Sequence, residues 1–280
     1  MTSTDALPTV HPLDGADIRL IVTDMDGTLL DERGDVPDRL WGQLERLRER
    51  GIVFAPASGR QYAALHRLLE PAIEGMVVIA ENGSIVMQDG VELSSVTIDA
   101  EGAAAIVGTL RGLAADGADL GVVVCGRRGA VVERTDERFL DAASEYFADV
   151  EVVPDVLAHD DDILKLAVID FHDAAAVAAA LAPFGATHQI VVSSERWVDV
   201  MSHSIDKGVA VRALQERLGV TPAQTVVFGD YLNDLQMLDA AEHSFAMANA
   251  HPTVRERARH VAGSNAEHGV VEAIERLLAR

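Results

Sequence analysis

The sequence predicts an α/β protein in which a parallel-sheet core is interrupted by a largely antiparallel α+β module. Three observations support this. Short apolar runs alternate with amphipathic segments up to residue 86, longer alternating strands and hairpin turns fill residues 87–203, and the first pattern returns over residues 204–280. Because strands that alternate with helices at this spacing run parallel, the two ends of the chain are expected to form one core.

The core begins after a proline-containing stretch, residues 1–17, that we expect to be a loose tail. In the first helix, Leu40, Leu44 and Leu47 share one face, and Gly51 ends it. The expected order is a strand over 18–23, a helix over 37–51, a strand over 52–59, a helix over 61–70 and a strand over 76–83.

The middle of the chain has a different pattern. Hairpins are expected over 86–93, 122–133 and 189–201, and alanine-rich helices over 100–116 and 172–185. A helix over 206–219 and a short strand, TVVFGD, then return to the core pattern. We therefore predict a discontinuous core, residues 1–86 and 204–280, with residues 87–203 inserted as a separate module.

Composition excludes several classes of function. The 280 residues carry a formal net charge of −22, which argues against nucleic acid or an anionic membrane as partner. The N-terminal segment lacks the basic start and apolar centre of a signal peptide, and no apolar run approaches the roughly 20 residues of a membrane helix. One cysteine, Cys125, permits no internal disulfide and is expected to be a small buried residue. We expect a cytoplasmic protein; its protein partners are not predicted.

Three apolar strands end in polar residues, in IRLIVTDMDGT, IVFAPASGR and TVVFGDYLNDL. The carboxyl ends of parallel strands share one edge of a sheet, where ligands bind. The residues that this edge would bring together are Asp24, Asp26, Ser58, Arg60, Asp230, Asn233 and Asp234. Four converging carboxylates need a hard divalent cation to offset their repulsion, and Mg²⁺ fits oxygen ligands of this kind.

The same edge suits a phosphate group. Such a metal keeps room for water and a substrate phosphate. Ser58 and the backbone amides around Gly59, at the start of a helix, suit phosphate oxygens. Lys207, also at a helix start, and Arg60 could supply the positive charge that the chain as a whole lacks. Arg60 could instead form a surface ion pair, and Asn82 either faces the substrate or belongs to a turn-forming Asn–Gly pair.

Four motifs occur in a familiar order: DMDGTLLD, PASGR, the pair Lys207–Gly208, and GDYLND. In this they resemble the haloacid dehalogenase superfamily of phosphatases. The large insertion between the second and third motifs, with ENG, FAMANA and GSNAEHGVVEAI, resembles the Cof-type branch, which contains sugar-phosphatase-like hydrolases with a large cap. The resemblance covers nearly all of the core and implies a Rossmann-like sheet with an α/β cap over residues 87–203.

The resemblance also implies roles. Asp24 would be the nucleophile that forms an aspartyl-phosphate, and Asp26 the general acid and base, with its backbone carbonyl on Mg²⁺. Asp24 and Asp230 would supply carboxylate ligands to the metal. Ser58 and Lys207 would bind the phosphoryl oxygens, and Lys207 would offset the charge of Asp24. Asn233 and Asp234 would hold the metal's waters or position neighbouring groups.

We therefore predict a Mg²⁺-dependent phosphomonoester hydrolase of small phosphorylated metabolites, with sugar phosphates as the expected class. Two alternatives stay open: a sugar-phosphate phosphomutase on a similar core, and a phospho-accepting signalling module in which turnover is incidental. The size of the insertion and the position of Asp26 count against the signalling module.

Specificity would lie in loops of the inserted module, which carry no readable motif. Arg127 and Arg128 could reach the site from a hairpin turn, although a solvated turn is the expectation, and His172, His188 and Trp197 are assigned no role.

Overall fold

The computed structural model of the chain describes residue 13 and residues 15–279. Most of the tail expected over residues 1–17 therefore lies outside the described residues. Leu13 and Ile18, which are described, are buried against the core. No helix of the described part has the length and apolarity needed to cross a membrane.

The core contains an eight-stranded sheet in the order β14–β13–β12–β1–β2–β3–β4–β5. Its strands are β1 (Leu20–Asp24), β2 (Val53–Ala57), β3 (Val77–Ala80), β4 (Ile85–Gln88), β5 (Val91–Ser95), β12 (Thr225–Gly229), β13 (His243–Ala246) and β14 (His260–Val261). The strands from β14 to β3 pair in parallel, as the sequence predicts, and β4 and β5 pair antiparallel. Strands β1 and β12 are adjacent although they are far apart in the sequence, so their ends lie side by side.

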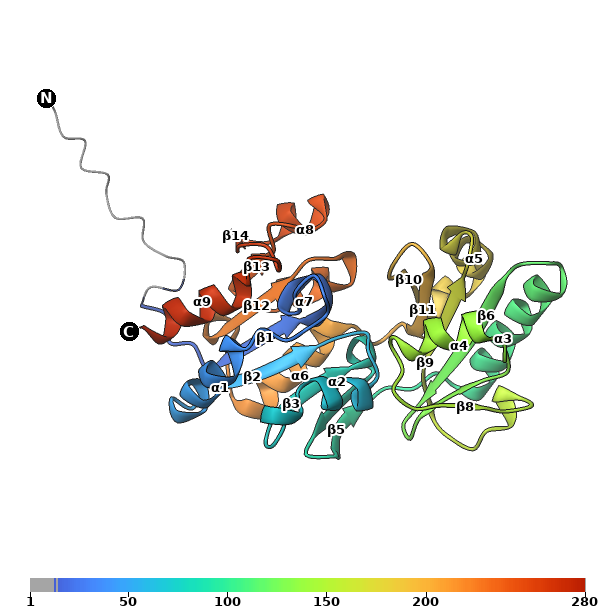
Figure 1. Ribbon diagram of the computed structural model, residues 1–280, viewed down its shortest axis with the longest axis horizontal. Coiled ribbons are helices and arrows are strands. Elements are labelled where there is room, and N and C mark those ends of the chain that lie inside the picture. The colour runs from blue at the N-terminus through green and yellow to red at the C-terminus, as the bar shows by residue number, and fades with distance from the viewer. Residues whose placement is uncertain (1–12, 14, 280) are drawn as a thin grey trace, which may run out of the picture.

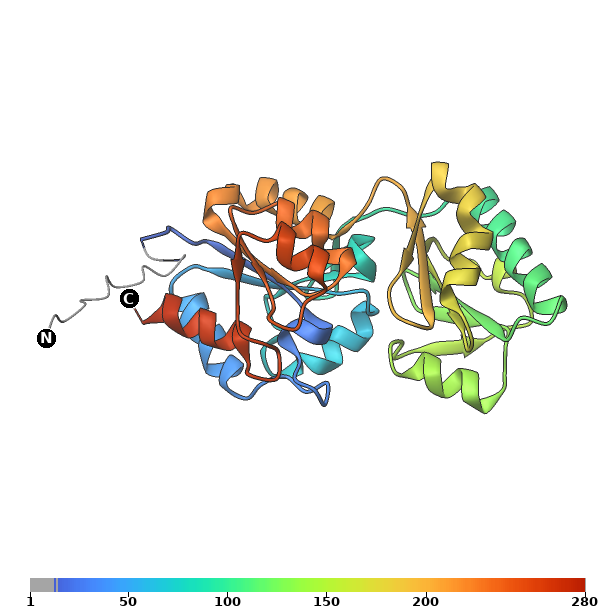
Figure 2. The same cartoon turned by 90° about the horizontal axis from the view of Figure 1, so that it is seen from above.

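Helices cover both faces of this sheet (Figure 2). They are α1 (Arg39–Glu49), α2 (Tyr62–Leu68), α6 (Lys207–Leu218), α7 (Leu235–Asp239), α8 (Pro252–Arg257) and α9 (Gly269–Leu278). Helices α1 and α9 lie together on one face, and α6 and α7 on the other. The buried face of α1 includes Leu40, Leu44 and Leu47, the three leucines that its sequence periodicity placed together.

A second domain, the cap, stands beside the core in Figure 1. Its six-stranded sheet has the order β10–β11–β9–β6–β7–β8, and all pairs are antiparallel except β7–β8. Its strands are β6 (Leu120–Gly126), β7 (Ala130–Val132), β8 (Val150–Val152), β9 (Ile163–Asp170), β10 (His188–Val192) and β11 (Trp197–Ser202). Its helices are α3 (Ala100–Ala115), α4 (Glu137–Ser144) and α5 (Ala174–Leu181).

The two faces of the cap sheet have separate apolar clusters. Residues of α3 and α5 pack on one face, and Phe139 of α4 packs on the other with the buried Cys125 and with Trp197. Because side chains alternate along a strand, Lys165 of β9 shares its face with Ala167, and both belong to the α4 side. A lysine in this position interrupts the apolar run Ile163–Ile169 of the strand.

The β4–β5 hairpin belongs to the core sheet, so the observed domain boundary differs from the expected one. We expected the inserted module to begin at residue 87, but β4 pairs with β3 of the core sheet. The strands therefore place the passage from core to cap after Ser95. An alternating hairpin sequence predicts two strands but does not indicate which sheet they join, because pairing depends on the exposed edge that is available. The return passage falls between β11, which ends at Ser202, and α6, which begins at Lys207.

Candidate active site

Polar side chains from four core segments meet at the carboxyl end of the core sheet. Asp24 is the last residue of β1, and Asp230 directly follows β12, the neighbouring strand. Ser58 directly follows β2, and Asn82 lies in the turn after β3. The parallel register thus brings together residues that are far apart in the sequence.

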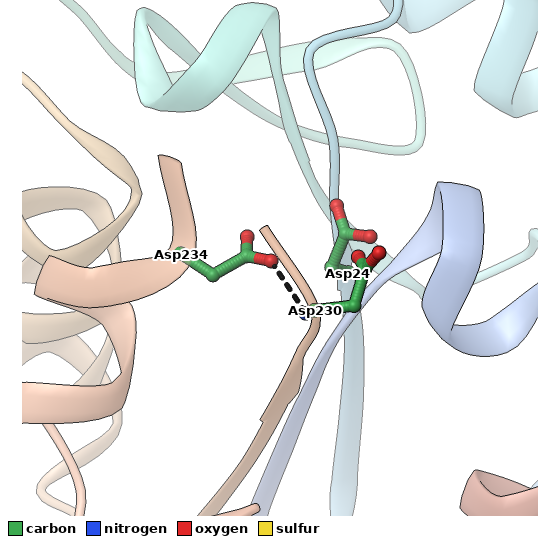
Figure 3. A group of neighbouring side chains, drawn as sticks. All are labelled: Asp24, Asp230 and Asp234. Atoms are coloured by element: carbon green, nitrogen blue, oxygen red, sulfur yellow. Dashed lines mark hydrogen bonds between the residues drawn. The ribbon is translucent and has the colours of Figure 1, made fainter. Parts of the chain in front are cut away.

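Three carboxylates lie at the centre of this group (Figure 3). One oxygen from each of Asp24, Asp230 and Asp234 can be chosen so that all lie within 4.8 Å of one another. Asp234 is already bonded: its Oδ2 accepts the backbone N–H groups of Asp230 at 2.9 Å and Tyr231 at 3.1 Å. Asp24 and Asp230 are therefore the two carboxylates best suited to bind a cation directly.

The donor set fits Mg²⁺. All the available atoms are oxygens, the type of ligand that this ion prefers. Burial, with the nearby charge of Asp234, raises the pKa of Asp230 to about 6, and a cation would remove part of this repulsion. Thr28 donates a hydrogen bond to Asp230 Oδ1 at 3.0 Å and so fixes the side chain's orientation.

The turn after β1 is shaped by a close approach. Gly27 has φ +78°, and a Cβ added there would lie 2.3 Å from Oδ2 of Asp230. Glycine therefore meets two requirements, a left-handed backbone and the absence of a side chain beside the carboxylate. Asn249 donates to the carbonyl of Gly27 at 2.7 Å and holds the turn from the other side.

Lys207 is the central cation of the site. It begins α6, where the side chain of Asp206 accepts the N–H of Val209 and caps the helix. Its Nζ lies 2.5 Å from Asp24 Oδ1 and 2.7 Å from Asp234 Oδ1, and its side chain is fully buried. Burial alone would lower the pKa of Lys207, but Asp234 and Asp24 outweigh it and raise that pKa. Lys207 is thus a fixed positive charge.

Asp24 has opposing influences on its ionisation. Burial raises its pKa well above the ordinary value, Lys207 opposes that rise, and Asp234 and Asp230 add to it. Asp24 therefore needs positive charge nearby to remain an ionised carboxylate.

Asp26 and Arg60 form a pair at the rim of the site. Arg60 Nε lies 2.8 Å from Asp26 Oδ2, and Nη2 lies 2.6 Å from Oδ1. The Asp26 side chain is 46% exposed, whereas that of Arg60 is 16% exposed. Both alternatives for Arg60 thus have a counterpart in the structure, because it forms an ion pair and also lines the cavity.

The cap roofs a cavity of about 270 Å³ over these residues. The core contributes Asp24, Asp26, Ser58, Gly59, Arg60, Asn82, Asp230, Tyr231 and Asn233, and the cap contributes Tyr146, Phe147, Lys165, Ser193, Ser194, Trp197 and Asp199. Of the site residues predicted from sequence, Lys207 and Asp234 do not line it but lie directly beneath, bonded to Asp24 or to the Asp230 amide.

A family model described as haloacid dehalogenase-like hydrolase matches residues 21–274. The chain belongs to this family. The fold class and the family resemblance predicted from sequence are therefore confirmed, and so is the prediction of an enzyme.

Several relatives of this haloacid dehalogenase-like hydrolase are named as phosphatases. One is 5-amino-6-(5-phospho-D-ribitylamino)uracil phosphatase YbjI of Escherichia coli, 29% identical over 266 residues, covering 93% of this chain and 96% of the relative. Another is HMP-PP phosphatase of Cronobacter sakazakii, 29% identical over 247 residues, covering 84% and 85% of the two chains. The solved structure of SMU.1108c from Streptococcus mutans superposes with a TM-score of 0.85 at 27% identity, covering 94% of this chain and all of that one.

The sequence did not reveal the cap residues of this hydrolase's cavity. Trp197, which was given no role, lines the cavity and lies at 5.5 Å, ring centre to ring centre, from Tyr146. Lys165 was not singled out, although a lysine within the apolar run ILKLAVID is a readable signal. Arg127 and Arg128 do not line the cavity; Arg127 instead forms ion pairs with Glu92 and Asp162.

Proposed function

We propose that this hydrolase is a Mg²⁺-dependent phosphatase that releases phosphate from small phosphorylated metabolites through an aspartyl-phosphate on Asp24. The single observation that carries the proposal is the position of Lys207, whose buried ammonium contacts both Asp24 and Asp234 under a roofed cavity. The names of the phosphatase relatives support the same reaction class. The cytoplasmic location predicted from the sequence is part of this proposal.

The chemistry follows from the protein's own groups. Asp24 Oδ attacks phosphorus, and the phosphoryl group moves from the ester oxygen to Asp24. Asp26, at the rim, gives a proton to the leaving alcohol and later takes one from the water that hydrolyses the intermediate. Lys207 offsets the negative charge of Asp24 so that it can approach a phosphate anion. Bound Mg²⁺, held by Asp24 and Asp230, would supply electrostatic stabilisation of the transferring group.

The proposed phosphate-binding groups come from three core segments, those that follow β2, β3 and β12. Ser58 is buried, and its Oγ accepts the backbone N–H of Arg60 at 3.1 Å, so its own proton remains able to reach a phosphate oxygen. Asn82 and Asn233 are bonded to each other at 3.1 Å, and both face the cavity. We assign these side chains to phosphate or leaving-group contacts.

The cavity volume favours small substrates, because a folded phosphoprotein could not place a side chain under the closed cap without opening it. The cap contributes both aromatic and hydroxyl groups, and sugar phosphates remain the class that we propose. The name of the Escherichia coli relative, a phosphatase of a phosphoribitylamino-uracil, adds phosphorylated heterocycles to the set that should be tested.

The test is phosphate release from a panel of sugar phosphates, nucleotides and phosphorylated heterocycles. Each ester is assayed with Mg²⁺, with a chelator, and with the Asp24→Asn variant. Asp31→Asn is a matched control, because this aspartate lies in the same segment and bonds to the loop amides of Arg33 and Asp35. We expect release that needs Mg²⁺ and is lost in Asp24→Asn alone.

Other products would favour the two alternatives. Conversion of a sugar 1-phosphate into a 6-phosphate without free phosphate would support the phosphomutase. A phospho-form that persists for hours would support the signalling module. Release that persists in Asp24→Asn would contradict the proposed mechanism.

A further inference from the structure

A buried charge cluster joins the cap to the core beside the cavity. Lys165 of β9 is 2% exposed, and its Nζ lies 2.7 Å from Glu81 Oε2 and 3.5 Å from Asp199 Oδ1. The same Nζ donates to the backbone carbonyl of Gly59 at 2.6 Å. Lys165 and Asp199 belong to the cap, whereas Glu81 and Gly59 belong to the core.

A second polar contact crosses the same boundary. Asn82 Nδ2 donates to Asp199 Oδ2 at 3.0 Å, and Asn82 Oδ1 accepts from Asn233 Nδ2 at 3.1 Å. A continuous path of hydrogen bonds and ion pairs therefore runs from the loop after β12, through Asn82, into the cap, and back to the core through Lys165. The catalytic proposal above uses neither Lys165 nor Glu81.

On the core side of this cluster, Glu81 and Asn82 have unfavourable backbone conformations. Glu81 has φ 50° and Asn82 φ 55°, a left-handed region that non-glycine residues rarely adopt. Two backbone hydrogen bonds join the turn at residues 81–83 to the turn at residues 58–60. The N–H of Glu81 donates to the carbonyl of Arg60 at 3.1 Å, and the N–H of Asn82 donates to the carbonyl of Ser58 at 2.9 Å. The turns 58–60 and 81–83 are therefore joined to each other, and the surrounding contacts must hold the left-handed residues in place.

The buried carboxylate of Glu81 has its ion-pair partner, Lys165, in the cap. The residue is 1% exposed, Lys165 is its ion-pair partner, and Oε1 accepts no hydrogen bond within the part of the chain that the structure describes. Burial raises the pKa of Glu81, and Lys165 opposes that rise. A buried carboxylate that loses its cation is strongly destabilised, so removal of Lys165 should disturb the turn at Glu81 first.

We propose that Lys165 is a positioning residue for phosphate binding. In the closed cap, its ammonium holds the carbonyl of Gly59 and the carboxylate of Glu81. It thereby sets the two turns that present Ser58, Gly59 and Asn82 to the cavity. This inference rests on the proposed function, since it names the cap residue that completes that site.

The test compares four variants with the wild-type enzyme. Lys165→Met keeps most of the length of the side chain but removes the charge, Glu81→Gln removes the opposing charge, and the double variant removes both. Arg127→Met is the matched control, because it breaks a cap–core ion pair with Glu92 at the surface, where the two side chains are 35% and 32% exposed.

Three quantities are measured: kcat and KM for the best ester, the affinity for inorganic phosphate with Mg²⁺ by calorimetry, and the thermal unfolding midpoint. We expect Lys165→Met to weaken phosphate affinity and raise KM by about tenfold or more, since small displacements of binding groups have effects of this size. Arg127→Met should change neither. In the double variant, the unfolding midpoint should recover in part, because Glu81 no longer carries an unpaired charge, whereas Asp199 still lacks its cation. Phosphate affinity should stay low because the bond to Gly59 is still missing.

Two results would overturn the inference. One is phosphate affinity in Lys165→Met equal to that in Arg127→Met. The other is phosphate affinity in the double variant that recovers together with stability, which would make Lys165 purely structural. If Lys165→Met does not fold, the phosphate affinity of the double variant tests the inference instead. Failure of the proposed function would give different results. The wild-type enzyme would then show no Mg²⁺-dependent phosphate release, or the Asp24→Asn variant would still release phosphate.

Discussion

The guanidinium of Arg60 binds the carboxylate of Asp26 at two points, Nε to Oδ2 at 2.8 Å and Nη2 to Oδ1 at 2.6 Å. Arg60 also donates to the backbone carbonyl of Glu145 in the cap at 3.0 Å and lies 5.3 Å over the ring of Tyr146. One side chain therefore links the proposed acid and base to the closed cap.

Arg60→Lys should lower kcat by up to about a hundredfold, the size of effect that a small misplacement of a catalytic group can have. Lysine keeps the charge but has no planar fork, so it cannot orient Asp26 at two points. Steady-state kinetics with the best ester measures the effect. Arg127→Lys serves as the control, because its ion pair with Glu92 lies outside the cavity lining. An unchanged kcat in Arg60→Lys would show that Asp26 does not need to be oriented by the planar guanidinium of Arg60.

Lys207→Met should abolish turnover and reduce the free energy of unfolding by about 3–5 kcal/mol, the usual result of removing one partner from a buried pair. Asp24 and Asp234 would then face each other without the ammonium that now contacts both. Chemical denaturation measures the loss. Arg257→Met, which breaks an exposed pair with Asp239, should leave the free energy of unfolding nearly unchanged, because solvent screens that pair. Equal losses in the two variants would contradict the assigned position of Lys207.

Gly27→Ala should weaken Mg²⁺ binding, because the added Cβ would lie 2.3 Å from Asp230 Oδ2 and displace that carboxylate. Calorimetric titration with Mg²⁺ measures the change. Gly34→Ala separates this effect from backbone strain, since Gly34 has a similar φ of +82° but no atom within 4 Å of the added Cβ. Both variants should lose stability, and Gly27→Ala alone should lose metal affinity.

The titration of Asp230 should make the metal-free protein less stable as the pH rises from about 4 to about 7. The pKa of Asp230 is raised from 3.8 to about 6, so the folded state holds a proton that the unfolded state releases. The resulting stabilisation is complete below the unfolded pKa and is lost as the pH passes through the folded one. The raised pKa of Asp24 acts in the same direction.

Thermal unfolding in chelator, measured from pH 4 to pH 8, checks this dependence. Asp230→Asn should make the curve flatter, and Mg²⁺ should raise the wild-type unfolding midpoint most above pH 6, where its ligands are ionised. A wild-type curve that rises with pH in chelator would show that other groups control the pH dependence.

The sequence by itself determined the elements of the core and the chemistry at the sheet edge. Apolar strands such as that ending at Asp24 bury both faces, and helices such as α1 have a regular apolar stripe, so local patterns identify them. The parallel order then places Asp24, Ser58 and Asp230 at one edge, because parallel strands point the same way.

Tertiary structure alone decided which cap residues reach the site and which sheet the β4–β5 hairpin joins. A hairpin's local sequence specifies its turn but not the strand that it pairs with. The contact of Lys165 with Glu81 depends on how the core sheet and the cap sheet are placed relative to each other. The bidentate ion pair of Arg60 with Asp26 also depends on tertiary structure, since it joins two turns that follow different strands. Long-range packing sets such pairs, and no periodicity within one segment encodes them.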